Sequence, residues 1–277
     1  MLCLDGRGRG TQTPAPRYSL PAVALAAVIM LWLWNSYFPS KDTPMLRWIM
    51  LIAALGMMAA LPGCKRSVSW HQKLTLVIGT PAGEVSGSSV TRVENITNKG
   101  ALVLPEARGT RSYWTGEAVA VEVLPGKWLF ALLEGEGGTD AGHWVYAAYD
   151  LNAALGADGY PSYETAMAKL RAQPKNVPVS LPADGLPILV TFGDITDPTS
   201  VQRVDPTDLA ASFGPSVDLK AVTLEITDEP VTVGRVDAVL GWLGPYPEPA
   251  LGPATGGTEN IPFYRRIHMG DFIRRPG

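Results

Sequence analysis

The chain has 277 residues, and 26 acidic side chains against 23 Lys or Arg side chains give it a formal net charge of −3. Nucleic-acid binding needs a concentrated basic face, and the body of the chain has no basic run, so the composition argues against this class of partner. The 24 prolines and 29 glycines favour many short strands over a few long helices.

Two hydrophobic segments open the chain, LPAVALAAVIMLWLW at 20–34 and IMLIAALGMMAAL at 49–61. A helix needs about 20 apolar residues to cross the hydrocarbon core of a bilayer, whereas a run of about 10–14 is typical of a signal-peptide core. The second segment falls in the shorter class. The first has a borderline length, and we expect it to span only if Tyr37 and Phe38 serve as interfacial anchors.

The second hydrophobic segment has the layout of a secretory signal peptide. The short basic stretch MLRW at 45–48 precedes it, and a small glycine and then Cys64 follow it. The residues Leu61-Pro62-Gly63-Cys64 resemble the cleavage box of a bacterial lipoprotein signal, with proline in place of the usual Ala, Ser or Thr. The resemblance implies cleavage before the cysteine and diacylation of its thiol, which holds a chain stably on a membrane.

The same residues allow a second topology, a two-helix membrane hairpin. The loop NSYFPSKDTPMLR at 35–47 would then lie outside, and the basic residues on both flanks would lie in the cytoplasm, as the positive-inside rule requires. Lipidation at Cys64 instead places the soluble part in the periplasm and makes residues 1–44 an upstream extension from a misplaced start codon. In both cases membrane lipid is the expected partner, through Cys64 or the N-terminal helices, and no protein partner is predicted.

Beyond the hydrophobic segments the pattern changes to a period of two, which is typical of half-buried strands. The strands KLTLVIGT (73–80) and VSGSSVTRV (85–93) flank the turn residues PAGE and predict an antiparallel hairpin. The strands EAVAVEVL (117–124) and WLFALLEG (128–135) flank PGK and predict a second hairpin.

More strands are expected further along the chain. The segment HWVYAAY (143–149) should pair next to the second hairpin as part of a meander, and LPILVTF (186–192) and VDLKAVTLEIT (217–227) should follow. Alternate positions of the predicted strands should point into the core. These positions are Leu74, Leu76, Ile78, Val119, Val121, Leu129, Ala131, Ile188, Val190, Val222 and Leu224.

Helix signals are few. The clearest is YPSYETAMAKLRAQ (160–173), with Ser162 as its N-cap, and a shorter one is DPTDLAASFG (205–214), capped by Asp205 or Thr207 and closed by its last glycine. The Pro/Gly-rich residues 244–260 predict an extended loop. The basic tail is expected to be a solvated end, with contact to anionic lipid as the alternative. Its arginines are Arg265, Arg266, Arg274 and Arg275.

These elements predict an α+β fold, mainly antiparallel β-sheet with one or two short helices packed on it, behind the N-terminal hydrophobic helices. A β-sandwich with helices inserted in its loops is the alternative. We expect residues 65–277 to form a single domain, although the segment PKNVPVSLPADG (174–185) could divide two lobes.

The strongest candidate for chemistry is EGEGGTDAGH, in which Glu134, Glu136, Asp140 and His143 surround four glycines. Such residues could ligate a metal or perform acid–base catalysis. The spacing fits neither an EF-hand nor a zinc signature, and a loop with solvated acids explains it at lower cost. We therefore assign no catalytic, cofactor-binding or metal-ligating residue, expect no cofactor, and name Cys64 as a lipidation site alone.

The other polar clusters have ordinary structural explanations. His71 follows a tryptophan just after the membrane boundary, where an amphipathic side chain is expected, and His268 is isolated in the tail. The serines of VSGSSV do not form a nucleophile elbow and predict a solvent-facing strand. The aspartates of 194–209 mark turns and a helix start.

Four segments, VSGSSV, GEAVAVEV, VDPTDLAASFGP and EITDEPVT, resemble an uncharacterised protein family of alphaproteobacteria, from about residue 68 to the C-terminus. That family has no established activity, so the resemblance implies no catalytic residue. The sequence predicts a membrane-tethered, non-enzymatic protein of the cell envelope that acts by binding or as a structural component. The rival prediction is a metal-assisted hydrolase that uses the 134–143 segment.

Overall fold

The computed structural model describes residues 65–98, 109–151, 163–244, 249–253 and 261–275. The chain divides into a compact unit of residues 67–96 and 110–277, described below, and a second unit of residues 1–66 and 97–109 that lies almost wholly outside the described residues. Cys64, both hydrophobic segments and Ser162 also lie outside them. Within the described ranges, no helix has the length and apolar character to cross a membrane.

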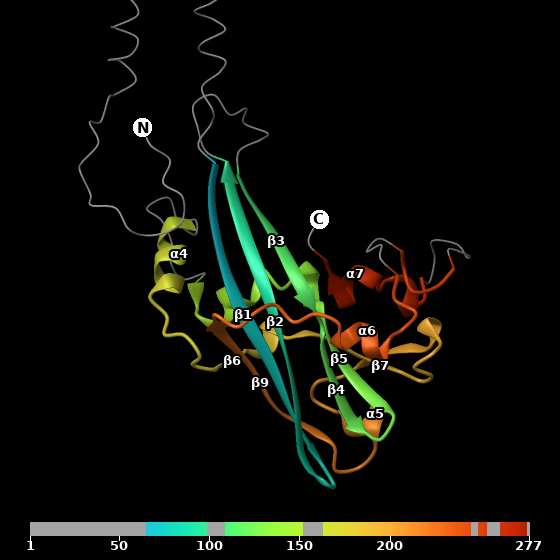
Figure 1. Ribbon diagram of the computed structural model, residues 1–277. Coiled ribbons are helices and arrows are strands. Elements are labelled where there is room, and N and C mark those ends of the chain that lie inside the picture. The colour runs from blue at the N-terminus through green and yellow to red at the C-terminus, as the bar shows by residue number, and fades with distance from the viewer. Residues whose placement is uncertain (1–64, 99–108, 152–162, 245–248, 254–260, 276–277) are drawn as a thin grey trace, which may run out of the picture. The chain divides into compact units, whose positions relative to one another are not determined.

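The first sheet has six strands in the order β10-β3-β2-β1-β9-β6 (Figure 1). The strands are β1 (Lys65–Thr80), β2 (Gly83–Asn98), β3 (Gly109–Glu117), β6 (Val179–Ser180), β9 (Asp218–Thr227) and β10 (Ile273–Arg274). Strands β1 and β9 pair antiparallel, with Leu74 opposite Leu224 and Leu76 opposite Val222. Two predicted core stripes that are far apart in sequence therefore lie side by side.

The second sheet has four antiparallel strands in the order β4-β5-β7-β8. They are β4 (Val119–Leu124), β5 (Lys127–Gly135), β7 (Pro187–Phe192) and β8 (Val201–Val204). All residues of β5 from Leu129 to Leu133 are buried, so this strand is covered on both faces rather than half-buried. Leu129, Ala131 and Leu133 belong to one hydrophobic core, and Phe130 and Leu132 belong to another.

The helices of the described residues are short and complete these two cores. They are α3 (Trp144–Ala148), α4 (Tyr163–Arg171), α5 (Ala210–Phe213), α6 (Arg235–Val239) and α7 (Met269–Phe272), with 3₁₀ turns at Glu136–Gly138, Ala183–Gly185, Pro198–Ser200 and Phe263–Arg265. Residues of α3, α4 and α5 join the core that both sheets share. Residues of α6 and α7 join the second core, where the Phe130 ring meets the edges or faces of Phe192 and Phe272 at centroid distances of 5.7 Å.

The β-rich α+β prediction is confirmed for the described residues, and both predicted hairpins form. The helices outnumber the one or two that were expected, because five lie in the described ranges. Every predicted core residue is buried except Ile188, which is partly buried against the second core. Strand β3 was not predicted.

The predicted strand at 143–149 is wrong, because the structure has helix α3 there. Its buried residues Trp144, Val145 and Tyr149 follow helical spacing rather than alternation. The predicted helix at 205–214 shrinks to α5, since Asp205 Oδ1 accepts hydrogen bonds from the backbone N–H and hydroxyl of Thr207, at 2.8 and 2.7 Å, and holds a turn instead.

The C-terminal tail is not the solvated end that we expected. Ile267, Phe272 and Ile273 are buried in the second core, and β10 pairs with β3. Arg274 lies over the Trp114 ring at 5.1 Å, and Arg275 forms an ion pair with Asp237 at 2.9 Å. The end of the tail therefore docks onto the sheets, because Arg274 and Arg275 reach partners while the neighbouring Ile273 is buried; Arg266 stays exposed.

Candidate functional sites

The four acid and imidazole side chains of the 134–143 segment point to different partners. The Glu136 carboxylate pairs with Arg203 on β8, and the Glu134 carboxyl faces Asp271 on α7. Asp140 Oδ1 accepts hydrogen bonds from His143 Nδ1 at 2.9 Å and from the Gly142 N–H at 2.8 Å. In the part of the chain that the structure describes, no three His, Cys, Asp or Glu side chains gather where they could hold a metal.

Asp140 and His143 form an oriented pair. The hydrogen bond that His143 donates to Asp140 raises the pKa of the imidazole above its ordinary value, and the negative charge of Asp140 acts in the same direction against the effect of burial. The His143 side chain is 54% exposed. The pair can hold a proton at the surface, and the carboxylate fixes the imidazole tautomer with the other ring nitrogen free to exchange protons.

The second arrangement joins Glu134 with a residue that the sequence analysis missed, Asp271. Asp271 is only 2% exposed, and burial is the main cause that raises the pKa of its carboxyl to about 7. The charge and hydrogen bonding of Glu134 raise it further, while the backbone N–H of His268, at 2.7 Å from Oδ2, and the nearby Arg274 oppose this. Burial and the neighbouring Glu134 charge thus let the Asp271 carboxyl keep its proton to a much higher pH than an exposed aspartate does.

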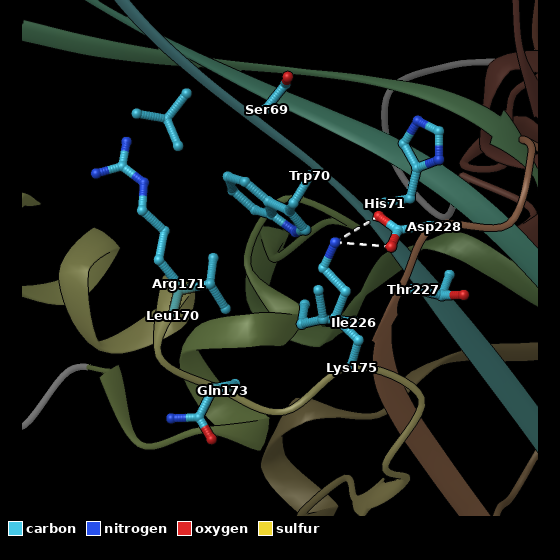
Figure 2. Close-up of a pocket in the computed structure, with 11 residues that line it drawn as sticks. Ser69, Trp70, His71, Leu170, Arg171, Gln173, Lys175, Ile226, Thr227 and Asp228 are labelled. Atoms are coloured by element: carbon cyan, nitrogen blue, oxygen red, sulfur yellow. Dashed lines mark hydrogen bonds and ion pairs between the residues drawn. The ribbon is translucent and has the colours of Figure 1, made fainter. Parts of the chain in front are cut away.

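The third arrangement is a pocket of ≈ 210 Å³ where the start of β1, the end of β9 and the residues after α4 meet (Figure 2). Figure 2 shows Trp70 between the side chains of Arg171 and Lys175, with Leu170 and Ile226 beside it. Ser69 and His71 lie on the opposite side of β1, as strand alternation requires. The lining thus combines the Trp70 ring and apolar side chains with two cations, one carboxylate and several polar side chains.

Hydrogen bonds hold Trp70 in a fixed orientation. Its indole Nε1–H donates to Gln72 Oε1 at 2.9 Å, and Gln72 Nε2 donates in turn to the Ala141 carbonyl at 2.6 Å. Gln72 is fully buried, so this chain of bonds is shielded from water. The Trp70 ring is thus a preorganised wall of the pocket rather than a mobile surface side chain.

The two rim cations differ in their pairing. Lys175 Nζ contacts both carboxylate oxygens of Asp228, at 2.6 and 2.7 Å, but the Asp228 side chain is 76% exposed, so water competes for this pair. Within the described ranges, Arg171 makes no hydrogen bond or ion pair. Its guanidinium is available to an anionic group at the mouth of the pocket.

The sequence carried only a partial signal for this pocket. Alternation could have placed Trp70 on the same face as Leu74, and the helix prediction placed Arg171 near a helix end. Nothing local indicated that these segments meet, since β1 and the end of α4 come together only through the packing of β9 and α4. His71, read as an interfacial residue, instead contacts the Glu229 carbonyl through Nδ1 at 2.7 Å.

Comparison with known proteins adds no assignment to any of the three arrangements. No protein-family model, no curated protein and no solved structure matches this chain.

Proposed function

We propose that this protein is tethered to the cell envelope through Cys64 and acts by binding a small ligand in the Trp70 pocket. The observation that carries the proposal is the pocket itself, which combines a fixed aromatic wall, apolar neighbours and an Arg171 side chain that has no partner among the described residues. Sites of this kind recognise ligands that have an apolar body and a small number of polar groups. The expected ligand therefore pairs an apolar body with one anionic group.

The tether is supported by the signal-like residues before Cys64. A thioether-linked diacyl group contributes about 0.8 kcal/mol for each buried CH₂, so two chains hold a domain stably on a membrane. On this proposal the soluble domain is periplasmic. With a two-helix hairpin it would be cytoplasmic.

Intact mass of the full-length protein extracted from membranes tests the tether. We expect a mature chain that begins at Cys64 and carries added acyl mass, and a Cys64→Ser variant without that mass. A wild-type chain that retains residues 46–63 and has no acyl adduct would establish the hairpin instead. The matching test is protease treatment of spheroplasts, which should digest a periplasmic domain and spare a cytoplasmic one.

Hexanoate is a suitable probe of the pocket because it joins a carboxylate to a short apolar chain. The full-length protein is held in nanodiscs of zwitterionic phosphatidylcholine, and amide hydrogen exchange is followed with and without hexanoate. We expect slower exchange over 68–71 and 170–175 in the wild type and a weaker effect in Arg171→Gln. The binding proposal is overturned if wild-type amide exchange stays unchanged both at saturating hexanoate and with every bilayer composition.

A further inference from the structure

The pocket lies very close in sequence to the proposed anchor. Val68, its first lining residue, comes four residues after Cys64, and β1 already begins at Lys65. An extended chain spans at most about 3.6 Å per residue, so the Cys64 and Val68 Cα atoms are at most roughly 14 Å apart. If Cys64 is lipidated, this short spacing keeps Val68 close to the lipid head groups.

The charge at the pocket mouth matches an anionic surface. Arg171 is exposed and unpaired among the described residues, and Lys175 is held only by an exposed aspartate. Lys169, two residues before Arg171, lies outside the pocket lining and donates to the Asp150 carbonyl at 2.8 Å, so the charge at the mouth comes from Arg171 and Lys175. The attraction of one cation to an anionic leaflet contributes about 1 kcal/mol to the free energy of binding, and an arginine can donate two N–H hydrogen bonds to one phosphate.

The apolar part of the pocket matches the atoms that follow a lipid phosphate. The volume of ≈ 210 Å³ is smaller than the roughly 300–1,000 Å³ of pockets that enclose a drug-sized ligand, so it suits a head-group fragment and not a whole acyl chain. Trp70 offers its ring to the glycerol and first acyl carbons, as tryptophan does at membrane interfaces. The head group would then enter while the chains stay in the bilayer.

We infer that the Trp70 pocket receives the phosphate head group of an anionic phospholipid from the same bilayer that holds the Cys64 anchor. This inference rests on the proposed function, and it specifies the source of the ligand. The shared chemistry, an anionic group on an apolar body, is also present in soluble amphipathic anions such as hexanoate. Binding to the bilayer would add a second, reversible membrane contact to the covalent one and fix the orientation of the domain.

The test compares full-length protein in three preparations: phosphatidylcholine nanodiscs, the same nanodiscs with phosphatidylglycerol added, and phosphatidylcholine nanodiscs with hexanoate. Amide exchange over 68–71 and 170–175 is the readout. We expect phosphatidylglycerol to slow exchange in the wild type. Arg171→Gln should weaken the lipid effect about fivefold, the factor that corresponds to about 1 kcal/mol. The control is Lys127→Gln, which removes one exposed cation from the β4–β5 turn, outside the pocket lining.

The outcomes separate the two proposals. Protection by phosphatidylglycerol that is lost in Arg171→Gln and kept in Lys127→Gln supports the head-group site. Protection by hexanoate alone overturns the bilayer source and leaves the binding function in place. If Arg171→Gln and Lys127→Gln lose the same amount of protection by phosphatidylglycerol, the lipid acts through the overall charge of the protein. That result also overturns the pocket as the lipid site. Protection by neither probe overturns both proposals.

Discussion

Glu117 and Asp271 are both 2% exposed, yet the structure surrounds these two carboxyl groups in opposite ways. The Glu117 carboxylate accepts hydrogen bonds from the backbone N–H groups of Gly234, of Arg235 at 2.9 Å and of Val236 at 3.1 Å, where α6 begins. Asp271 receives a single backbone N–H, from His268, and has the Glu134 carboxyl beside it. At the same degree of burial, Glu117 has three backbone donors, whereas Asp271 has one such donor and a neighbouring carboxyl, and burial raises the pKa of Asp271.

The largest expected effect is that of Glu117→Ala. The substitution leaves three N–H groups at the start of α6 without their acceptor, one in a buried bond and two in partly buried bonds. We expect the free energy of unfolding of the full-length protein to fall by roughly 3–5 kcal/mol, as measured by urea denaturation followed by near-UV circular dichroism.

The matched control is Glu122→Ala. Glu122 is exposed on β4 and accepts one N–H, from Gly126 at 2.8 Å. Its loss should change stability by less than about 1 kcal/mol. If Glu117→Ala and Glu122→Ala lower the free energy of unfolding by the same amount, the three hydrogen bonds to Glu117 contribute no extra stability. The comparison of Glu117 with Asp271 then has no energetic basis.

Asp271→Asn should alter the pH dependence of stability. The folded-state pKa of Asp271, about 7, lies above its ordinary value of 3.8. The folded state therefore binds this proton more tightly, and the stabilisation is fully present below about pH 4 and is lost as the pH rises to about 7. The gap of about three pH units sets an upper limit of roughly 4 kcal/mol.

Asparagine carries no titratable proton, so the variant should lack this loss. We expect the unfolding free energy of Asp271→Asn to exceed that of the wild type at about pH 8, and the difference to shrink towards about pH 4. Urea denaturation at a series of pH values measures it. If the unfolding free energies of the wild type and the variant change with pH in parallel, Asp271 is ionised over the whole pH range and the prediction is wrong.

Glu134→Gln should have a smaller effect. It removes the neighbouring negative charge but leaves the burial of Asp271, which is the main cause of the raised pKa. We expect the pKa of Asp271 to fall by roughly one pH unit, followed by carbon NMR of the carboxyl. Glu136→Gln is the control from the same segment, because Glu136 pairs with Arg203 instead, and it should leave Asp271 unchanged.

The smallest expected effect is that of Asp140→Asn. In the wild type the hydrogen bond that His143 donates to Asp140 raises the pKa of His143, so this pair adds stability below pH 6.5 that is lost as the pH rises through the folded-state pKa. Exposure limits the contribution to less than about 1 kcal/mol. Proton NMR titration should show a lower His143 pKa in Asp140→Asn and no change in Glu136→Gln; an unmoved His143 in both variants contradicts the pairing.

Sequence reasoning succeeded where the signal was local. The hairpins around PAGE and PGK and the alternating core residues of β1, β4 and β9 followed from turn chemistry and a period of two. It failed for 143–149, where a short apolar run fits a strand or a helix equally until the packing of Trp144 and Tyr149 decides. For the candidate sites, the sequence indicated Glu134, Asp140 and His143. It did not indicate Asp271, which lies beside Glu134, and it did not indicate Trp70 or Arg171, which form the separate pocket.

The sequence by itself determined a β-rich domain behind two hydrophobic segments, with turns and strand faces at stated residues, because periodicity and turn preferences act over a few neighbouring residues. Only the tertiary structure decided which side chains meet. In the folded chain, Glu134 lies beside Asp271 and Glu136 pairs with Arg203. Apolar residues of the C-terminal tail are buried in the second core, and Trp70 lines a pocket formed by distant segments. These contacts join segments that are far apart in the sequence, and they depend on strand order and packing that no local pattern encodes.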